Sequence, residues 1–161
     1  MALSNFERMI QMADEVFASR TDPDQLNVDE EVITRLQQIH PATVSEFDDG
    51  NGPAAWILGF PTTQDLMNRF LDDKISEKEL YEQTPLNISY EALYLCSAMV
   101  LPEYRRKGIA EKLVTQAIES IKKDYPIKAL FVWAFSKEGN ALAEKIASRT
   151  GLPLKKKHGP N

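Results

Sequence analysis

Apolar residues near the start of the chain recur at helical spacing. They lie three or four positions apart, which is the period of one face of an amphipathic helix. These positions are Phe6, Met9, Ile10, Ala13, Val16 and Phe17. Turn-forming residues at 21–24 are expected to end this helix. Asn27 and Glu30 form a capping pair for a second amphipathic helix, which Pro41 ends.

The pattern then changes from helical spacing to short apolar runs. Residues 43–47 and 54–60 are typical of strands, and the turn formers between them predict a hairpin. Two short amphipathic helices are expected within residues 61–87. The second begins at Ser76, with Glu79 as its capping-box partner.

The C-terminal half alternates buried strands with helices. Residues 92–101 and 129–135 are almost wholly apolar and short, which favours strands buried on both faces. A helix is expected after each, over 109–121 and 140–149, and a last short strand over 152–157. Strand, helix and strand in succession imply a parallel pair. We therefore expect one domain, residues 1–161, of the mixed α/β (α+β) class.

Composition narrows the class of protein further. The 161 residues are 43% hydrophobic and 27% charged, which is ordinary for a globular domain. No apolar run approaches the ~20 residues of a membrane helix, and no secretory signal is recognisable, so we expect a cytoplasmic protein without a membrane partner. Cys96 is the one cysteine and there are two histidines, so neither a disulfide framework nor a metal site is expected.

Charge is divided unevenly along the chain. Residues 1–90 carry a net charge of −11 and residues 91–161 carry +6. A basic half suits an anionic ligand and an acidic half suits a cationic one, although two solvated faces would give the same pattern. Nucleic acid is not an expected partner, since the chain is acidic overall and has no dense basic stripe.

The most informative segment joins the strand 92–101 to the helix after it. It reads Val-Leu-Pro-Glu-Tyr-Arg-Arg-Lys-Gly-Ile-Ala, from Val100 to Ala110. The first backbone N–H groups of a helix lack intrahelical partners and carry partial positive charge. Small residues at Gly108 and Ala110 let an anion approach them, and Arg105, Arg106 and Lys107 add cations. This segment predicts a site for a pyrophosphate.

These residues resemble the acyl-CoA signature of the GNAT superfamily of N-acetyltransferases. A second block supports the resemblance: Asn140, Ala143 and the Gly151-Leu152 pair follow the next strand at the spacing of that family's Asn-containing helix. The resemblance covers about residues 90–152. It implies a central mixed sheet with helices on both faces, and it makes 61–87 a helical insertion between the family's third and fourth strands, expected over the acceptor site.

The resemblance also implies roles for individual residues. The backbone of Arg105, Arg106, Lys107, Gly108, Ile109 and Ala110 would hold the pyrophosphate of acetyl-CoA. Met99 and Val100 would pair with the pantetheine arm, and Asn140 would contact the same arm. An amine would then attack the acetyl group directly, and a backbone N–H would stabilise the oxyanion. Together with the charge division, this favours a cationic small molecule or a basic peptide as the acceptor.

The acid and base are less clearly marked. An alkyl ammonium needs a base, and Tyr94 aligns with the glutamate that serves as base in one branch of the family. Glu91 is the nearest carboxylate. The alternatives without a catalytic role are that Tyr94 is an aromatic residue of the core and that Glu91 is a solvated surface charge. With strict alternation, Tyr94 shares a strand face with Cys96, Ala98 and Val100. Cys96 is expected to be a buried structural thiol.

Three features depart from the family pattern. Ala147 stands where many members carry a tyrosine acid, residues 61–87 are inserted, and the final strand pair is short. The acceptor side is then either open or completed by another chain, as in a homodimer. Two other functions therefore stay open: a CoA-binding module without turnover, and a phosphate-binding or protein-interaction domain.

Overall fold

The computed structural model describes residues 3–19, 26, 30–134 and 137–158. The predicted turn at 21–24, Asn27 of the predicted capping pair and Phe135 lie outside the described residues. The elements in chain order are α1 (Asn5–Ser19), α2 (Glu30–Ile39), η1 (Pro41–Thr43), β1 (Val44–Asp48), β2 (Pro53–Thr62), α3 (Gln64–Leu71), α4 (Glu77–Gln83), β3 (Ala92–Val100), η2 (Pro102–Tyr104), α5 (Ile109–Asp124), β4 (Ala129–Ala134), α6 (Lys137–Thr150) and β5 (Leu154–His158).

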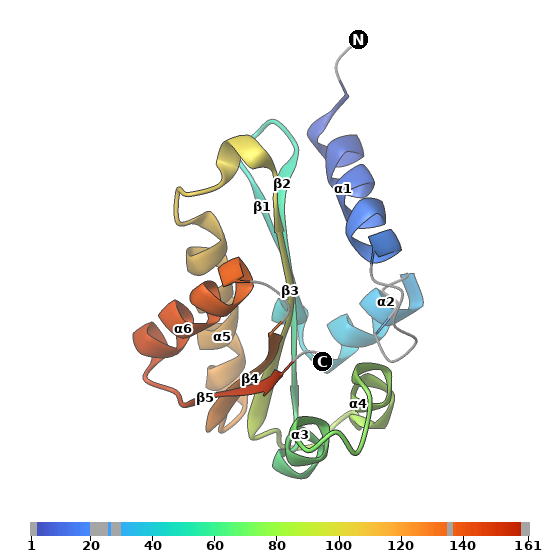
Figure 1. The fold of residues 1–161 in the computed structure, drawn as a ribbon, viewed down its shortest axis with the longest axis vertical. Coiled ribbons are helices and arrows are strands. Elements are labelled where there is room, and N and C mark those ends of the chain that lie inside the picture. The colour runs from blue at the N-terminus through green and yellow to red at the C-terminus, as the bar shows by residue number, and fades with distance from the viewer. Residues whose placement is uncertain (1–2, 20–25, 27–29, 135–136, 159–161) are drawn as a thin grey trace.

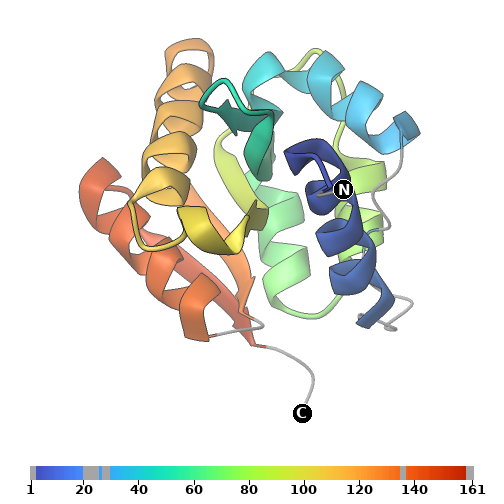
Figure 2. The same ribbon diagram turned by 90° about the horizontal axis from the view of Figure 1, so that it is seen from above.

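The strands form one mixed sheet in the order β1-β2-β3-β4-β5. β1, β2 and β3 pair antiparallel, whereas β3, β4 and β5 pair parallel. Helices α5 and α6 cover one face of the sheet and α1 to α4 cover the other (Figures 1 and 2). This arrangement confirms the predicted mixed α/β sheet with helices on both faces.

Local signals placed several elements correctly. Ser76 caps α4 through the predicted capping box, in which its hydroxyl accepts from the Glu79 N–H and the Glu79 carboxylate accepts from the Ser76 N–H. Pro41 opens η1 directly after α2 ends. α3 and α4 occupy the stretch between β2 and β3; that they are an insertion relative to the family stays a prediction.

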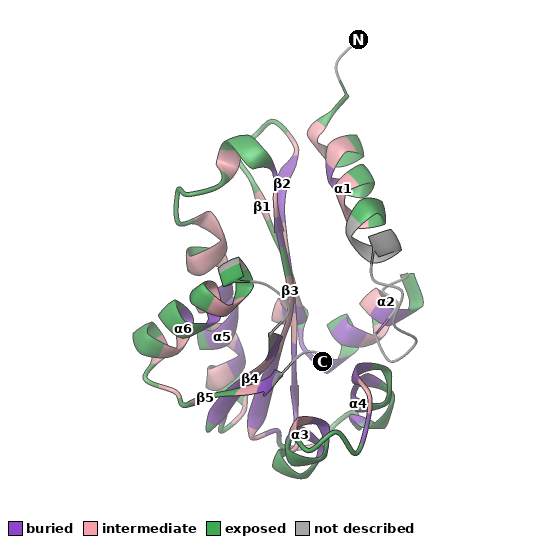
Figure 3. Cartoon of the chain, in the orientation of Figure 1, coloured by how far each residue is buried: buried purple, intermediate pink, exposed green. Residues whose placement is uncertain are grey.

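Aromatic rings form the centre of the core on the α3 and α4 side of the sheet. Tyr94 of β3 packs edge-on against Phe60 and Phe70, with ring centroids 5.4 and 5.3 Å apart. Its ring also lies 5.0 Å from that of Phe131 in β4. Buried positions run along the middle strands of the sheet (Figure 3).

Within the described residues, no helix has the length and apolar character needed to cross a membrane.

A buried carboxylate joins α4 to this core. Glu77 is 4% exposed, and one of its oxygens accepts a hydrogen bond from the Tyr94 hydroxyl. Its other oxygen accepts from the Leu26 N–H at 2.7 Å. A buried carboxylate is costly unless it is hydrogen-bonded, so the Tyr94 hydroxyl stabilises the docking of α4 against the sheet.

Tyr94→Phe should therefore lower the free energy of unfolding by about 1–2 kcal/mol, because it removes one partner of the buried Glu77 carboxylate. Urea denaturation measures this difference. Tyr104→Phe is the matched control: it also removes one hydroxyl that donates to a carboxylate, but Asp49 there is exposed. Equal effects of the two substitutions would contradict a stabilising role for the Tyr94 hydroxyl.

Candidate active site

The two central strands separate at one end of the sheet. β3 and β4 pair from Ala92 opposite Ala129 as far as Leu95 opposite Val132. β3 nevertheless continues to Val100 and β4 to Ala134. Beyond Leu95 the edge of β3 that would face β4 therefore borders a gap between the strands.

A β-bulge lies at the point of separation. The β2–β3 register shifts so that Gly59 pairs with Leu95 and Leu58 with Ser97, which leaves Cys96 as the extra residue. Gly59 is required there, because a Cβ on it would lie 2.9 Å from the Tyr94 carbonyl oxygen. The bulge thus depends on a residue that has no side chain.

The bulge reverses which side chains share a face of β3. Directly paired residues of antiparallel strands point to the same side. Tyr94, Ser97 and Met99 pair with alternate residues of β2, so all three face the side of α1 to α4. The predicted grouping of Tyr94 with Ala98 and Val100 is therefore wrong, because strict alternation cannot include the extra residue of a bulge.

A cavity of about 730 Å³ occupies the gap. β2, β3 and β4 line it together with Met12 of α1, one side of α5 from Ala110 to Ile121, and α6. Two buried polar atoms on its wall, Ser97 Oγ and Asn140 Oδ1, have no hydrogen-bond partner in the described part of the chain. Buried polar atoms are nearly always satisfied, so a ligand with donor groups fits this cavity.

Residues 101–110 follow β3, and we call them the anion-binding loop after the role that the sequence predicts for them. Arg106 and Gly108 have left-handed backbone, with φ of 63° and 75°. Gly108 is the N-cap of α5 and no side chain caps the helix there. A Cβ on Gly108 would meet nothing within 4 Å. A hollow of about 250 Å³ lies beside Gly108, Ile109 and Ala110, so the first turn of α5 presents its N–H groups to open space.

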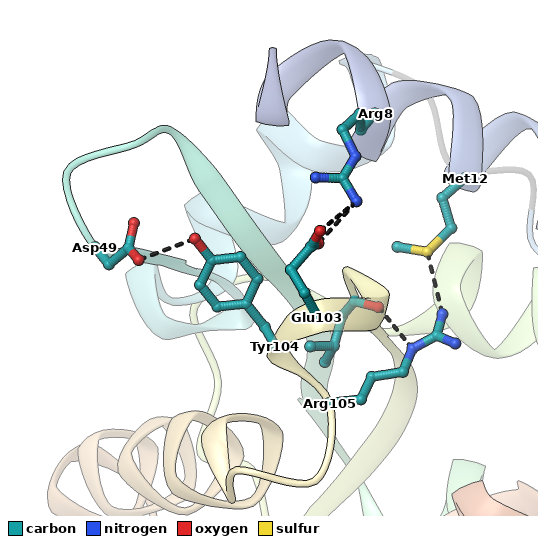
Figure 4. Close-up of polar contacts among 7 residues, drawn as sticks. Arg8, Met12, Asp49, Glu103, Tyr104 and Arg105 are labelled. Atoms are coloured by element: carbon teal, nitrogen blue, oxygen red, sulfur yellow. Dashed lines mark hydrogen bonds and ion pairs between the residues drawn. The ribbon is translucent and has the colours of Figure 1, made fainter. Parts of the chain in front are cut away.

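Contacts with α1 and the β1–β2 hairpin hold this loop (Figure 4). The Arg8 guanidinium of α1 donates to both carboxylate oxygens of Glu103, at 2.7 and 2.8 Å. This interaction lowers the pKa of Glu103. The Tyr104 hydroxyl donates to Asp49 at 2.9 Å, which lowers the pKa of Asp49 and raises that of Tyr104. We call these two contacts the loop clamp.

Arg105 points toward α1. Its Nε donates to the Val100 carbonyl oxygen at 2.9 Å, and its Nη2 lies 3.5 Å from the Met12 sulfur. Lys107 is exposed, with its Nζ 5.8 Å from the centroid of the Tyr104 ring. The Arg105 side chain therefore packs on protein groups, which leaves its backbone to meet an anion, whereas the Lys107 side chain is exposed beside the Tyr104 ring.

Most of the predicted cofactor residues come together. The main cavity is lined by Met99, Val100, Arg105, Arg106, Ala110 and Asn140, and the hollow by Arg105, Arg106, Gly108, Ile109 and Ala110. Lys107 lines neither.

The predicted acid–base residues lie elsewhere. Tyr94 is 1% exposed and bonded to Glu77, while Glu91 at the other end of β3 pairs with Lys128 at 2.8 Å. Neither lines the cavity, so their catalytic role stays a prediction. Ala147, at the family's tyrosine position, does not line it either. Among the described residues no three His, Cys, Asp or Glu side chains are grouped as a metal site.

Sequence reasoning missed the contributions of Arg8, Met12 and Ser97. A hydroxyl within the apolar run 92–101 was a visible signal for Ser97. Nothing local marked Arg8 or Met12, which reach the site only because α1 packs beside the loop.

Comparisons with known proteins identify the fold and the family of the chain. The model of the acetyltransferase (GNAT) family matches residues 10–147. An aminoglycoside acetyltransferase from an uncultured soil metagenomic sample, solved with trehalose, is 16% identical with a TM-score of 0.54, over 99% of this chain and 91% of that one. Its complex with sisomicin is 15% identical with a TM-score of 0.51, over 89% and 83%. At this identity the likeness shows the fold alone.

A search of curated proteins gave no significant match. The family match, however, extends over most of the chain and includes the separated strands and the anion-binding loop. The chain therefore belongs to the acetyltransferase (GNAT) family.

Proposed function

We propose that the protein is an N-acetyltransferase that uses acetyl-CoA and passes the acetyl group directly to an amine nitrogen. The observation that carries this proposal is the gap between β3 and β4, with the open N-terminus of α5 beside it. Such a gap exposes strand backbone to a ligand, and the helix terminus supplies N–H groups to a pyrophosphate.

The residues around the gap suit the parts of acetyl-CoA. The N–H groups of Gly108, Ile109 and Ala110 would hold the pyrophosphate, with Arg106 as the nearby cation. The backbone of Met99 and Val100 faces the gap rather than β4, so it would pair with the amides of the pantetheine arm. Asn140 Oδ1, which has no partner among the residues that the structure describes, would accept from the same arm.

Acetyl transfer needs stabilisation of negative charge on the carbonyl oxygen. Backbone N–H groups of β3 beyond Leu95 are our candidates, because this segment no longer pairs with β4 and borders the gap. Acetyl-CoA supplies the activated thioester, and the chain binds it and excludes water. The cytoplasmic location and a homodimer stay predictions.

Acetyl-CoA binding is tested with Ala110→Glu. Saturating acetyl-CoA, at 100 times its dissociation constant, should stabilise the wild type by about 2.7 kcal/mol. Ala110→Glu should weaken binding at least about tenfold, because its carboxylate would meet the phosphates, while a glutamate in the first helical turn should leave the fold intact. The measurement is the shift in Tm with ligand.

Gln116→Glu is the control, since it adds the same charge at an exposed position farther along α5. No shift for the wild type at millimolar acetyl-CoA would contradict the proposal and favour a phosphate-binding or protein-interaction domain. A shift without thiol release for any amine would favour a CoA-binding module. An unaltered shift in Ala110→Glu would show that the anion-binding loop does not hold the pyrophosphate.

The loop clamp yields a second prediction. Arg8→Gln should raise the Kd for acetyl-CoA about two- to fivefold at pH 7, since one exposed ion pair contributes modestly to the order of the loop. Arg8 lowers the pKa of Glu103, so the ion pair is fully formed at pH values above the usual pKa of a glutamate. It is lost as the pH falls through the lowered pKa of Glu103. The difference between variant and wild type should therefore vanish in acid.

Calorimetric titration at several pH values measures the effect. Arg69→Gln breaks another exposed arginine–carboxylate pair, with Asp65 at 3.0 Å in α3, and serves as the control. A Kd that is the same in all three proteins would contradict a role for the clamp.

A further inference from the structure

The cavity extends to the face of the sheet opposite α5 and α6. On that side it is lined by Met12 of α1 and by Leu58, Ser97 and Met99 of the paired strands β2 and β3. Trp133 of β4 completes this wall. If acetyl-CoA lies on the α5 side, as the proposed function requires, the acceptor enters against this wall.

The wall offers nothing to neutralise an ammonium group. Among the described residues that line the cavity there is no carboxylate and no histidine, and the ionisable ones are Cys96, Arg105 and Arg106. Both arginines are cations. A buried ammonium without a counter-charge is unfavourable, so the lining opposes the cationic acceptor that the charge division predicts.

An internal cation already lies against Trp133, although Lys157 itself does not line the cavity. Lys157 of β5 places its Nζ 4.7 Å from the centroid of the Trp133 ring and 4.4 Å from that of Phe70. Its side chain is only 9% exposed, and it pairs with Asp73 at 3.1 Å. The Lys157 ammonium would disfavour a second cation against Trp133 to the extent that Asp73 leaves its charge uncompensated.

Among the described residues, the lining also has no carboxylate, histidine, lysine or tyrosine to act as a base, which leaves the Cys96 thiol as the one ionisable group there that is not already a cation. An alkyl ammonium, with a pKa near ~10.4, must lose a proton before it can attack a thioester. An aromatic amine is already neutral at pH 7, because its lone pair is delocalised into the ring. Such an acceptor needs neither a base to deprotonate it nor a carboxylate to bind it.

We propose that the acceptor is a weakly basic aromatic amine, an inference that rests on the proposed function. Its ring packs against Met12, Leu58 and Trp133, and its N–H donates to the unpartnered Ser97 Oγ. The nitrogen lone pair forms a C–N bond to the acetyl carbon, and the C–S bond breaks. The nitrogen loses one proton and the thiolate gains one, which yields an anilide and CoA.

Two isomeric amines test this directly. 4-Methylaniline and benzylamine have the same atoms, but only benzylamine is an ammonium at pH 7. We expect kcat/KM to be at least about tenfold higher for 4-methylaniline at pH 7. The value for benzylamine should rise with pH as its ammonium deprotonates, while that for 4-methylaniline stays flat. Thiol release and mass spectrometry of the product measure both.

Two variants test the named contacts. Ser97→Ala should lower kcat/KM for 4-methylaniline about fivefold, and Ser97→Thr, which keeps the hydroxyl, should restore most of it. Lys157→Met keeps the packing on Phe70 and Trp133 but removes the charge. It should raise kcat/KM for benzylamine about threefold relative to that for 4-methylaniline.

The outcomes separate this inference from the proposed function. Absence of an acetyl-CoA-dependent Tm shift would reject the proposed function. With acetyl-CoA binding intact, a preference at pH 7 for benzylamine, sisomicin or a lysine peptide would overturn the aromatic acceptor. Binding of acetyl-CoA without acetylation of 4-methylaniline would overturn it too. Unchanged kinetics of Ser97→Ala or Lys157→Met would reject the role of that residue.

Discussion

Parallel strands share hydrogen bonds only while they stay about 4.8 Å apart. β3 and β4 do so as far as Leu95 and Val132, and then each continues without the other. The site depends on this separation, because it exposes the backbone of β3 and makes room for a cavity between two layers of helices. The bulge at Cys96 and the side-chain-free Gly59 opposite Leu95 fix where β3 changes its course.

Elements distant in sequence stabilise this open end of the sheet. The anion-binding loop follows β3 directly, so the end of the strand and the helix N-terminus lie beside one cavity. Arg8 and Glu103, 95 residues apart, tie α1 to the loop, and Tyr104 ties the β1–β2 hairpin to it. α1 also places Met12 on the cavity wall. One helix thereby contributes to the order of the loop and to the shape of the acceptor side.

Local chemistry made much of this predictable from the sequence. Nearby residues alone specified four elements. The capping box at Ser76 marked the start of α4, the proline after α2 marked its end, and the two apolar runs marked β3 and β4. The anion-binding loop was also visible, because Gly108 and Ala110 directly follow a buried strand. Which face of β3 carries Ser97 could not be predicted. The bulge at Cys96 arises from the pairing of β3 with β2, which the sequence of β3 alone does not show. Arg8, Met12 and Lys157 reach the site through packing that no local pattern encodes.

The central claim is that acetyl-CoA occupies the gap between β3 and β4 and the N-terminus of α5. Amide hydrogen exchange with and without acetyl-CoA, resolved by residue, tests it most directly. We expect slower exchange in the ligand complex at the amides of residues 97–100 and 108–110, with the β1–β2 hairpin turn unchanged. Protection confined to other segments, or none at saturating acetyl-CoA, would contradict it.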